Sequence, residues 1–142
     1  MEPARAPGVF SLIVPALSAA GILVILAPGI GNVRARETSV RDGVYTEAQA
    51  ERGSKTFDRV CIECHDPSRF VGELMKPWEN QSALPLFDAI CRTMPEDNPG
   101  TLPRQPCADI LSHIFRLNGF KAGSEELKGT DEAMRAVRIE GF

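Results

Sequence analysis

Two cysteines and a histidine lie within the five residues Cys61-Ile62-Glu63-Cys64-His65 (CIECH), in a chain with only four cysteines and two histidines. Thiols three positions apart on one helical turn can each form a thioether with a vinyl group of the same haem. The imidazole of the next residue is then brought to the iron. The motif therefore predicts covalent attachment of one c-type haem through Cys61 and Cys64, with His65 as an axial ligand.

Two other uses of such a motif fit this chain less well. A structural zinc site needs a second close pair of ligands, and the remaining cysteines, Cys91 and Cys107, are far apart in the sequence. A thioredoxin-like redox pair lies in a βαβ setting, and no strand alternation is visible here. Haem attachment is therefore the leading interpretation.

An iron bound by His65 needs either a second protein ligand or an open site for a small molecule. Met94 stands directly before Pro95 in the segment TMPEDNPG, whose prolines reduce the freedom that is lost on ligation. Its alternative role is core packing. Met75 falls within an expected helix, and His113 is interpreted as a surface or boundary residue. We predict Met94 as the second axial ligand, which raises the reduction potential relative to a bis-histidine haem.

The first helix that positions the motif has a clear start. Thr46 is the expected N-cap, Gln49 completes a capping box, and Glu47 is favourable to the helix dipole. Gly53 lies in the middle of this helix, at a cost of roughly 1 kcal/mol relative to alanine. This glycine is either a tolerated neutral substitution or the place where a second helix crosses so closely that a Cβ would not fit. The buried stripe of the helix is expected to be Ala50, Gly53, Phe57 and Val60.

Three more helices are expected after the motif. A short one covers Phe70–Trp78, another begins after Ser82 as N-cap, and a last one runs from near Pro103 to Leu117. Pro85 falls in the first turn of its helix, where a missing N–H does no harm. The apolar faces of the last two are Leu84, Phe87, Ile90 and Cys91, and Ile110, Leu111, Ile114, Phe115 and Leu117. A proline-rich turn, MPEDNPGTLP, separates them, and Asn118-Gly119 caps the last helix.

The N-terminal part has a different composition. Positions 7–33 carry no charged residue and are bounded by Arg5, Arg34 and Arg36, as in an export signal or a membrane anchor. Cleavage of a signal and retention of an anchor through residues 8–31 both stay open. In either case the rest of the chain is exported, which predicts a periplasmic location.

The chain therefore divides into 1–35 as signal or anchor, 36–45 as a polar linker, 46–120 as one mostly helical domain and 121–142 as a tail. The tail wraps the domain or is partly disordered. Removing residues 1–35 removes Arg5, Arg34 and Glu2 and leaves 14 basic and 18 acidic residues, a net charge of −4. This balance argues against a nucleic-acid partner and permits a protein partner with a basic face.

These segments together resemble a class I (monohaem) cytochrome c of the short bacterial periplasmic type. The resemblance covers about residues 44–127 and rests on VYTEAQAERG, CIECH, LFDAICRTMPEDNPGTL and ADILSHIFRLNGF. It implies an all-α cytochrome c fold of three to five short helices around one covalent haem, with His65 and Met94 as ligands. It also implies that the first and last helices cross at a glycine–aromatic contact, which matches Gly53 with Phe115 or a neighbour.

The sequence departs from that family in three places: the segment between His65 and Met94 is short, and the other two departures concern a proline and a pair of cysteines. The proline whose carbonyl holds the imidazole N–H has no clear equivalent, Pro67 being a weak candidate. Trp78 either donates to a haem propionate or anchors the core. Cys91 and Cys107 are either two buried thiols or a disulfide, since the exported compartment is oxidising. A disulfide would close the loop that contains Met94 and stabilise the fold by roughly 3 kcal/mol.

The function expected from this pattern is one-electron transfer rather than catalysis. The chain would accept electrons from a quinoprotein-type dehydrogenase or a respiratory donor and pass them to another redox protein. The alternative is a cytochrome subunit, itself not catalytic, of a membrane-associated dehydrogenase or oxidase complex. A gas-binding or peroxidase-like site with an open iron position is disfavoured by the Met94 loop.

Overall fold

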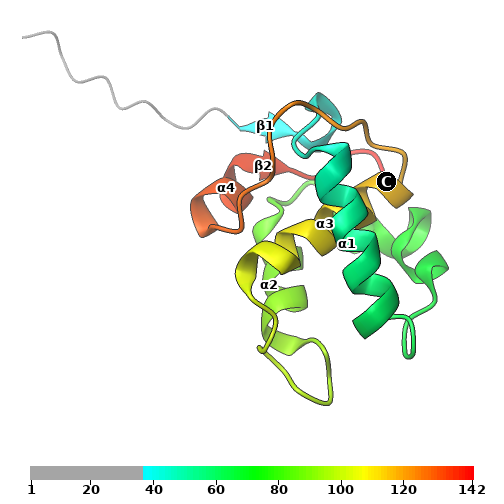
Figure 1. Ribbon diagram of the computed structural model, residues 1–142. Helices are drawn as coiled ribbons and strands as arrows, with labels where there is room; N and C mark the ends of the chain where they lie inside the picture. The colour runs from blue at the N-terminus through cyan, green and yellow to red at the C-terminus, as the bar shows by residue number, and fades with distance from the viewer. Residues whose placement is uncertain (1–36) are drawn as a thin grey trace, which may run out of the picture. The chain divides into compact units, whose positions relative to one another are not determined.

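The computed structural model describes residues 37–142, so the expected signal or anchor segment lies outside the described part. The chain is mostly helical, as expected (Figure 1). The elements in order are β1 (Thr38–Ser39), the 3-10 helix η1 (Val40–Asp42), α1 (Glu47–Val60), the 3-10 helices η2 (Pro67–Phe70) and η3 (Gly72–Trp78), α2 (Leu84–Thr93), α3 (Arg104–Leu117), α4 (Asp131–Ala136) and β2 (Val137–Arg138).

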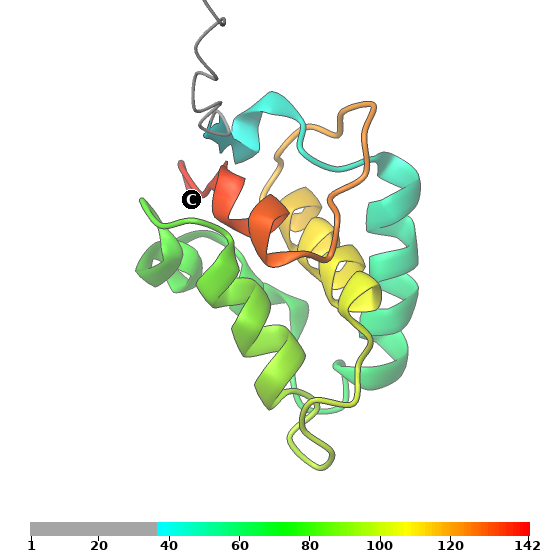
Figure 2. The ribbon, with the colours of Figure 1, turned by 90° about the vertical axis from the view of Figure 1, so that its left-hand side faces the viewer.

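Helices α1 and α3 cross closely at the centre of the fold, with α2 on the other side of α3 (Figure 2). The crossing needs a glycine in α1. A Cβ built on Gly53 would lie 1.8 Å from the carbonyl oxygen of Asp109 and 3.0 Å from Cβ of His113. The close-crossing interpretation of Gly53 is therefore confirmed. Of the expected partners, Phe115 is wrong, because Gly53 meets the backbone of Asp109 and Cβ of His113, while Phe115 packs against Tyr45.

The start of α1 is as predicted except for one half of the capping box, and Glu47 stands in the first turn. Thr46 is the N-cap, and its Oγ1 accepts a hydrogen bond of 3.1 Å from the Gln49 N–H. The reciprocal half of the capping box is wrong, because the Gln49 amide is buried and turned inward. It donates to Asp109 Oδ1 (3.0 Å) and to the Leu127 carbonyl (2.8 Å), and accepts from the Leu127 N–H (2.7 Å). The Gln49 amide satisfies buried polar groups of Asp109 and Leu127, and this need outweighs a hydrogen bond to the N-cap backbone.

Helix α2 begins one residue later than expected. Ala83 is the N-cap, and no side chain caps the helix. Ser82 lies instead in an antiparallel bridge with Arg138, so its prediction as N-cap is wrong. Pro85 does stand in the first turn. On the apolar face, Leu84 is half-buried and Leu86 takes the buried position.

The segments expected as linker and tail both belong to the folded unit. Strands β1 and β2 pair in parallel, with Thr38 opposite Val137. Residues from both segments are fully buried in the core, among them Val40, Tyr45, Met134 and Ile139. Figure 2 shows these terminal segments at one end of the helices and the loop after α2 at the other. The alternative in which the tail wraps the domain is therefore the correct one.

The remaining elements differ from expectation only in detail. The short helix after the motif is formed as two 3-10 helices, η2 and η3, with Pro77 inside the second. Helix α3 ends at Asn118 as C-cap, and Gly119 follows with φ +76°, a left-handed conformation that favours glycine. Within residues 37–142, no helix has the length and apolar character needed to cross a bilayer.

Candidate functional site

A cavity of about 390 Å³ opens between the C-terminal end of α1, the η2–η3 segment, the end of α2 with its following loop, and α3. Its lining is mostly apolar. All the residues singled out from the sequence as haem-binding lie on it, namely Cys61, Cys64, His65, Trp78 and Met94. Two parts of the chain that are far apart in the sequence, the CIECH motif and the Met94 loop, therefore meet at one hollow.

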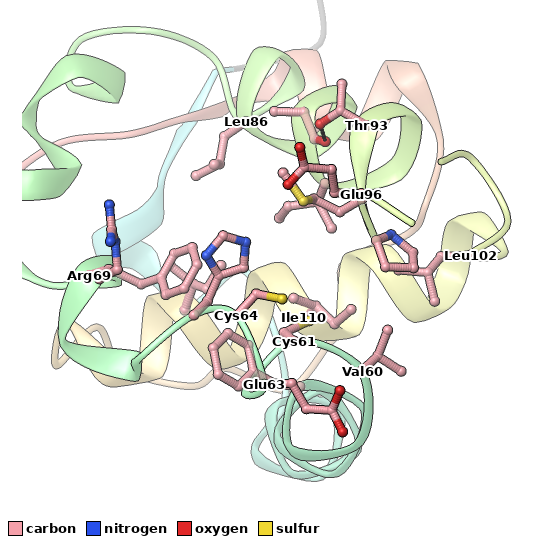
Figure 3. A pocket seen from close by; sticks show the side chains of 18 of the residues that line it. Val60, Cys61, Glu63, Cys64, Arg69, Leu86, Thr93, Glu96, Leu102 and Ile110 are labelled. Atoms are coloured by element: carbon pink, nitrogen blue, oxygen red, sulfur yellow. Dashed lines mark hydrogen bonds between the residues drawn. The ribbon is translucent and has the colours of Figure 1, made fainter. Parts of the chain in front are cut away.

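The two parts face one another across the space. Figure 3 shows Cys61 and Cys64 on one side and Glu96 on the other, with Arg69 near one end and Leu102 near the opposite end. A flat ligand in this cavity would contact the motif on one side and the loop after α2 on the other.

The motif continues the last turn of α1. The Cys61 N–H donates to the Phe57 carbonyl (2.8 Å), and the His65 N–H donates to the Cys61 carbonyl (2.9 Å). Cys61 is half-buried, Cys64 is exposed, and neither is in a disulfide. Burial raises the pKa of the Cys61 thiol, so this thiol is held in its neutral form. The turn thus presents two reduced thiols and one imidazole to the same cavity.

The His65 ring is held by an aromatic neighbour. The ring of Phe70 meets it edge to face, with centroids 5.6 Å apart and planes at 83°. Phe70 also packs at 5.4 Å, edge to face, on Phe57. Asn118 fixes the Phe70 segment to the end of α3, because its Nδ2 donates to the Phe70 carbonyl (2.7 Å) and its Oδ1 accepts from the Gly72 N–H (3.0 Å).

Phe70 and Asn118 are site residues that the sequence did not indicate. Asn118 was expected only as a helix cap, and no spacing rule connects it to His65. In the part of the chain that the structure describes, no hydrogen bond joins the His65 ring to Pro67, the weak candidate for that role. The contact that orients the ring is aromatic instead.

Met94 is the first residue after α2, and it lines the cavity. It is the C-cap, in extended conformation (φ −115°, ψ 152°), and it is half-buried. The Met94–Pro95 bond is cis. A turn follows, in which the Asn98 N–H donates to the Pro95 carbonyl (3.0 Å). A second thioether, that of Met75 on η3, is 2% exposed and also lines the cavity.

A disulfide joins Cys91 near the end of α2 to Cys107 in the first turn of α3, with Cα atoms 5.7 Å apart. This is the pair considered from the sequence. Cys91 is 6% exposed and Cys107 is fully buried. The bond brackets the loop that carries Met94.

The lining of the cavity carries more acidic side chains than basic ones. Carboxylates come from Glu63, Glu96 and Asp97, and Arg69 is the one lysine or arginine on the lining. Within residues 37–142, no hydrogen bond or ion pair holds the Arg69 guanidinium. Trp78 is half-buried, lines the cavity and also packs against the core, so both of its expected roles remain compatible with its place. Arg69 was missed because a lone arginine in a polar stretch carries no pattern.

His113 was expected to be a surface or boundary residue, and this is wrong. It is 6% exposed, because α1 crosses over it at Gly53. Its ring lies 5.4 Å from that of Phe57, and its Nδ1 lies 3.3 Å from Nη2 of Arg116. Burial and the Arg116 charge lower the pKa of His113. It does not line the cavity.

Comparison with known proteins adds no assignment: no family model, no curated protein and no solved structure matches this chain. Among residues 37–142, no three histidine, cysteine, aspartate or glutamate side chains converge to hold a metal ion directly.

Proposed function

We propose that this chain is an exported one-electron carrier of the cytochrome c type. One haem would occupy the cavity, tied by thioethers to Cys61 and Cys64 and ligated by His65 and Met94. The observation that supports this most is the meeting of both thiols, the imidazole and the thioether on one mostly apolar cavity. The close crossing of α1 and α3 at Gly53 agrees with the proposed fold.

The residues around the cavity suit a haem in size and polarity. A volume of about 390 Å³ lies within the roughly 300–1,000 Å³ of ligand-binding pockets. Apolar side chains, including Leu86, Ile90 and Ile110, would cover the macrocycle, while Arg69 would pair with a propionate at the rim. The bound group supplies an iron that alternates between the ferrous and ferric states.

The chain's own residues would do three things. His65 and Met94 would both ligate the iron, which would leave no place there for a substrate and would favour electron transfer. Phe70, fixed by Asn118, orients the imidazole. Covalent attachment and a packed helical core would keep the ligands in place in both oxidation states.

Export is supported by the disulfide. Disulfides persist in oxidising compartments such as the bacterial periplasm and are rare in the cytosol. The Cys91–Cys107 bond and the uncharged N-terminal segment therefore both support the proposal that the domain is exported. There the carrier would exchange electrons with a donor and an acceptor protein.

Expression together with haem-maturation machinery tests the proposal. The purified protein should be coloured, should carry the added mass of one haem that survives denaturation, and should lose it in the Cys61→Ala, Cys64→Ala variant. Colourless protein without added mass would refute the proposed function. Met94→Ala should abolish the weak charge-transfer band that methionine-ligated haem shows in the ferric state, and it should lower the reduction potential. Met75→Leu should leave the band and the potential unchanged.

A further inference from the structure

The loop between α2 and α3 supplies much of one side of the cavity. Met94, Pro95, Glu96, Asp97 and Leu102 all line it. Both ends of this loop are joined at one covalent point, because Cys91 precedes Met94 by three residues and Cys107 follows Leu102 by five.

Few other interactions hold the loop in place. Within the described residues 37–142, the hydrogen bonds of residues 95–101 stay inside the loop: the Asn98 N–H donates to the Pro95 carbonyl, and Thr101 Oγ1 donates to the Asn98 carbonyl (2.8 Å). No ion pair connects Glu96 or Asp97 to the rest of that part of the chain. The position of the loop against the cavity therefore depends mainly on where its two ends are held.

The disulfide is sheltered from reductants. Cys107 is fully buried and Cys91 is 6% exposed, inside the packing between α2 and α3. A reductase or a small thiol cannot reach these sulfur atoms without local opening of the helices. The bond is therefore suited to a permanent role rather than to a reversible switch.

We propose that the Cys91–Cys107 disulfide is a clamp that positions the Met94 thioether for ligation, and so keeps the sixth position of the iron closed. The ligand role of Met94 rests on the proposed function; the clamping of the loop does not. With both loop ends fixed, the thioether is presented at a high effective concentration, which falls when the ends can separate. Cys91 and Cys107 act through Met94 and are positioning residues.

The test compares wild type with the double variant Cys91→Ala, Cys107→Ala, each matured with haem. The ferric protein is titrated with alkali while the methionine charge-transfer band is followed. We expect the equilibrium constant for dissociation of Met94 from the iron to rise about tenfold in the double variant. The midpoint of the titration should therefore fall by about one pH unit, with haem content unchanged. Val40→Ala is the matched control. It lowers stability because it removes buried methyl groups in η1, and Val40 is not part of the cavity lining.

Two results of the titration would overturn the clamp. One is an unchanged midpoint in the double variant. The other is an equal shift in Val40→Ala, since global stability would then explain the effect. Wild type reduced under mild denaturant and then returned to buffer provides the same comparison if the double variant does not fold.

A second readout needs no ligation of iron. Hydrogen exchange of the Asn98 amide, which donates to the Pro95 carbonyl within the loop, should accelerate by about tenfold in the double variant, while exchange in α1 changes little. If the wild-type protein shows no methionine band but exchange of the Asn98 amide still accelerates in the double variant, the ligand role of Met94 fails and only the clamping of the loop stands. Unchanged exchange of this amide refutes the clamp even where the band is present.

Discussion

Substitution of Gly53 by alanine is the sharpest test of the helix crossing. Alanine alone would favour a helix by about 1 kcal/mol over glycine. The added Cβ, however, would lie 1.8 Å from the Asp109 carbonyl oxygen, and α1 and α3 would have to separate by roughly 1.5 Å to reach normal contact. The obstacle is backbone, which cannot rotate away as a side chain can.

Overpacking of this kind costs about 1–3 kcal/mol and occasionally more, and the rigid neighbour places Gly53→Ala at the upper end. After the gain in helix propensity, we expect a net loss of about 2 kcal/mol in the free energy of unfolding. For a domain of this size, that corresponds to a fall of about 10 °C in Tm. Phe57 and Ile110 lie next to the crossing on the two helices and line the cavity, so its shape should change too.

The assay is thermal and urea unfolding followed by helical circular dichroism. Asp58→Ala is the control, since it adds alanine at an exposed position of the same helix and should be neutral or stabilising. A Gly53→Ala protein as stable as wild type, or more stable, would show that the helices do not approach as closely as the structure has them.

Three other predictions concern the cavity and its surroundings. In the protein matured with the proposed haem, Arg69→Gln should lower the reduction potential by a few tens of millivolts in redox titration, because a cation near the iron would favour the ferrous state; Arg69→Lys should restore most of the potential. Phe70→Leu should alter the ferric electron paramagnetic resonance spectrum, because the His65 ring loses its edge-to-face partner, and an identical spectrum would refute that role. Burial and Arg116 lower the pKa of His113 below its ordinary value of 6.5, so the folded state binds fewer protons there than the unfolded chain. Its contribution to stability is full above about pH 6.5 and declines as the pH falls, and His113→Gln should flatten the decline in Tm between about pH 7 and pH 5.

Local patterns predicted the helices well because their signals are local. The N-cap at Thr46, the proline at position 85 and the cap at Asn118-Gly119 act within one turn of the backbone, and each stands where expected. The predictions of Gln49 in a capping box and of Ser82 as an N-cap were wrong for the opposite reason. The side chains or backbones of these two residues pair with residues distant in the sequence, and such pairing outweighs a cap of about 1 kcal/mol.

By itself, the sequence determined the candidate chemistry: two thiols and an imidazole on one turn, a methionine before a proline, and apolar stripes at helical spacing. The tertiary structure decided which of these groups share a cavity, that Arg69 and Phe70 join them, that His113 is buried, and that Cys91 bonds to Cys107. The physical reason is that residue type and short-range spacing are set along the chain. Burial, proximity and pairing arise only when α1, α2 and α3 pack together.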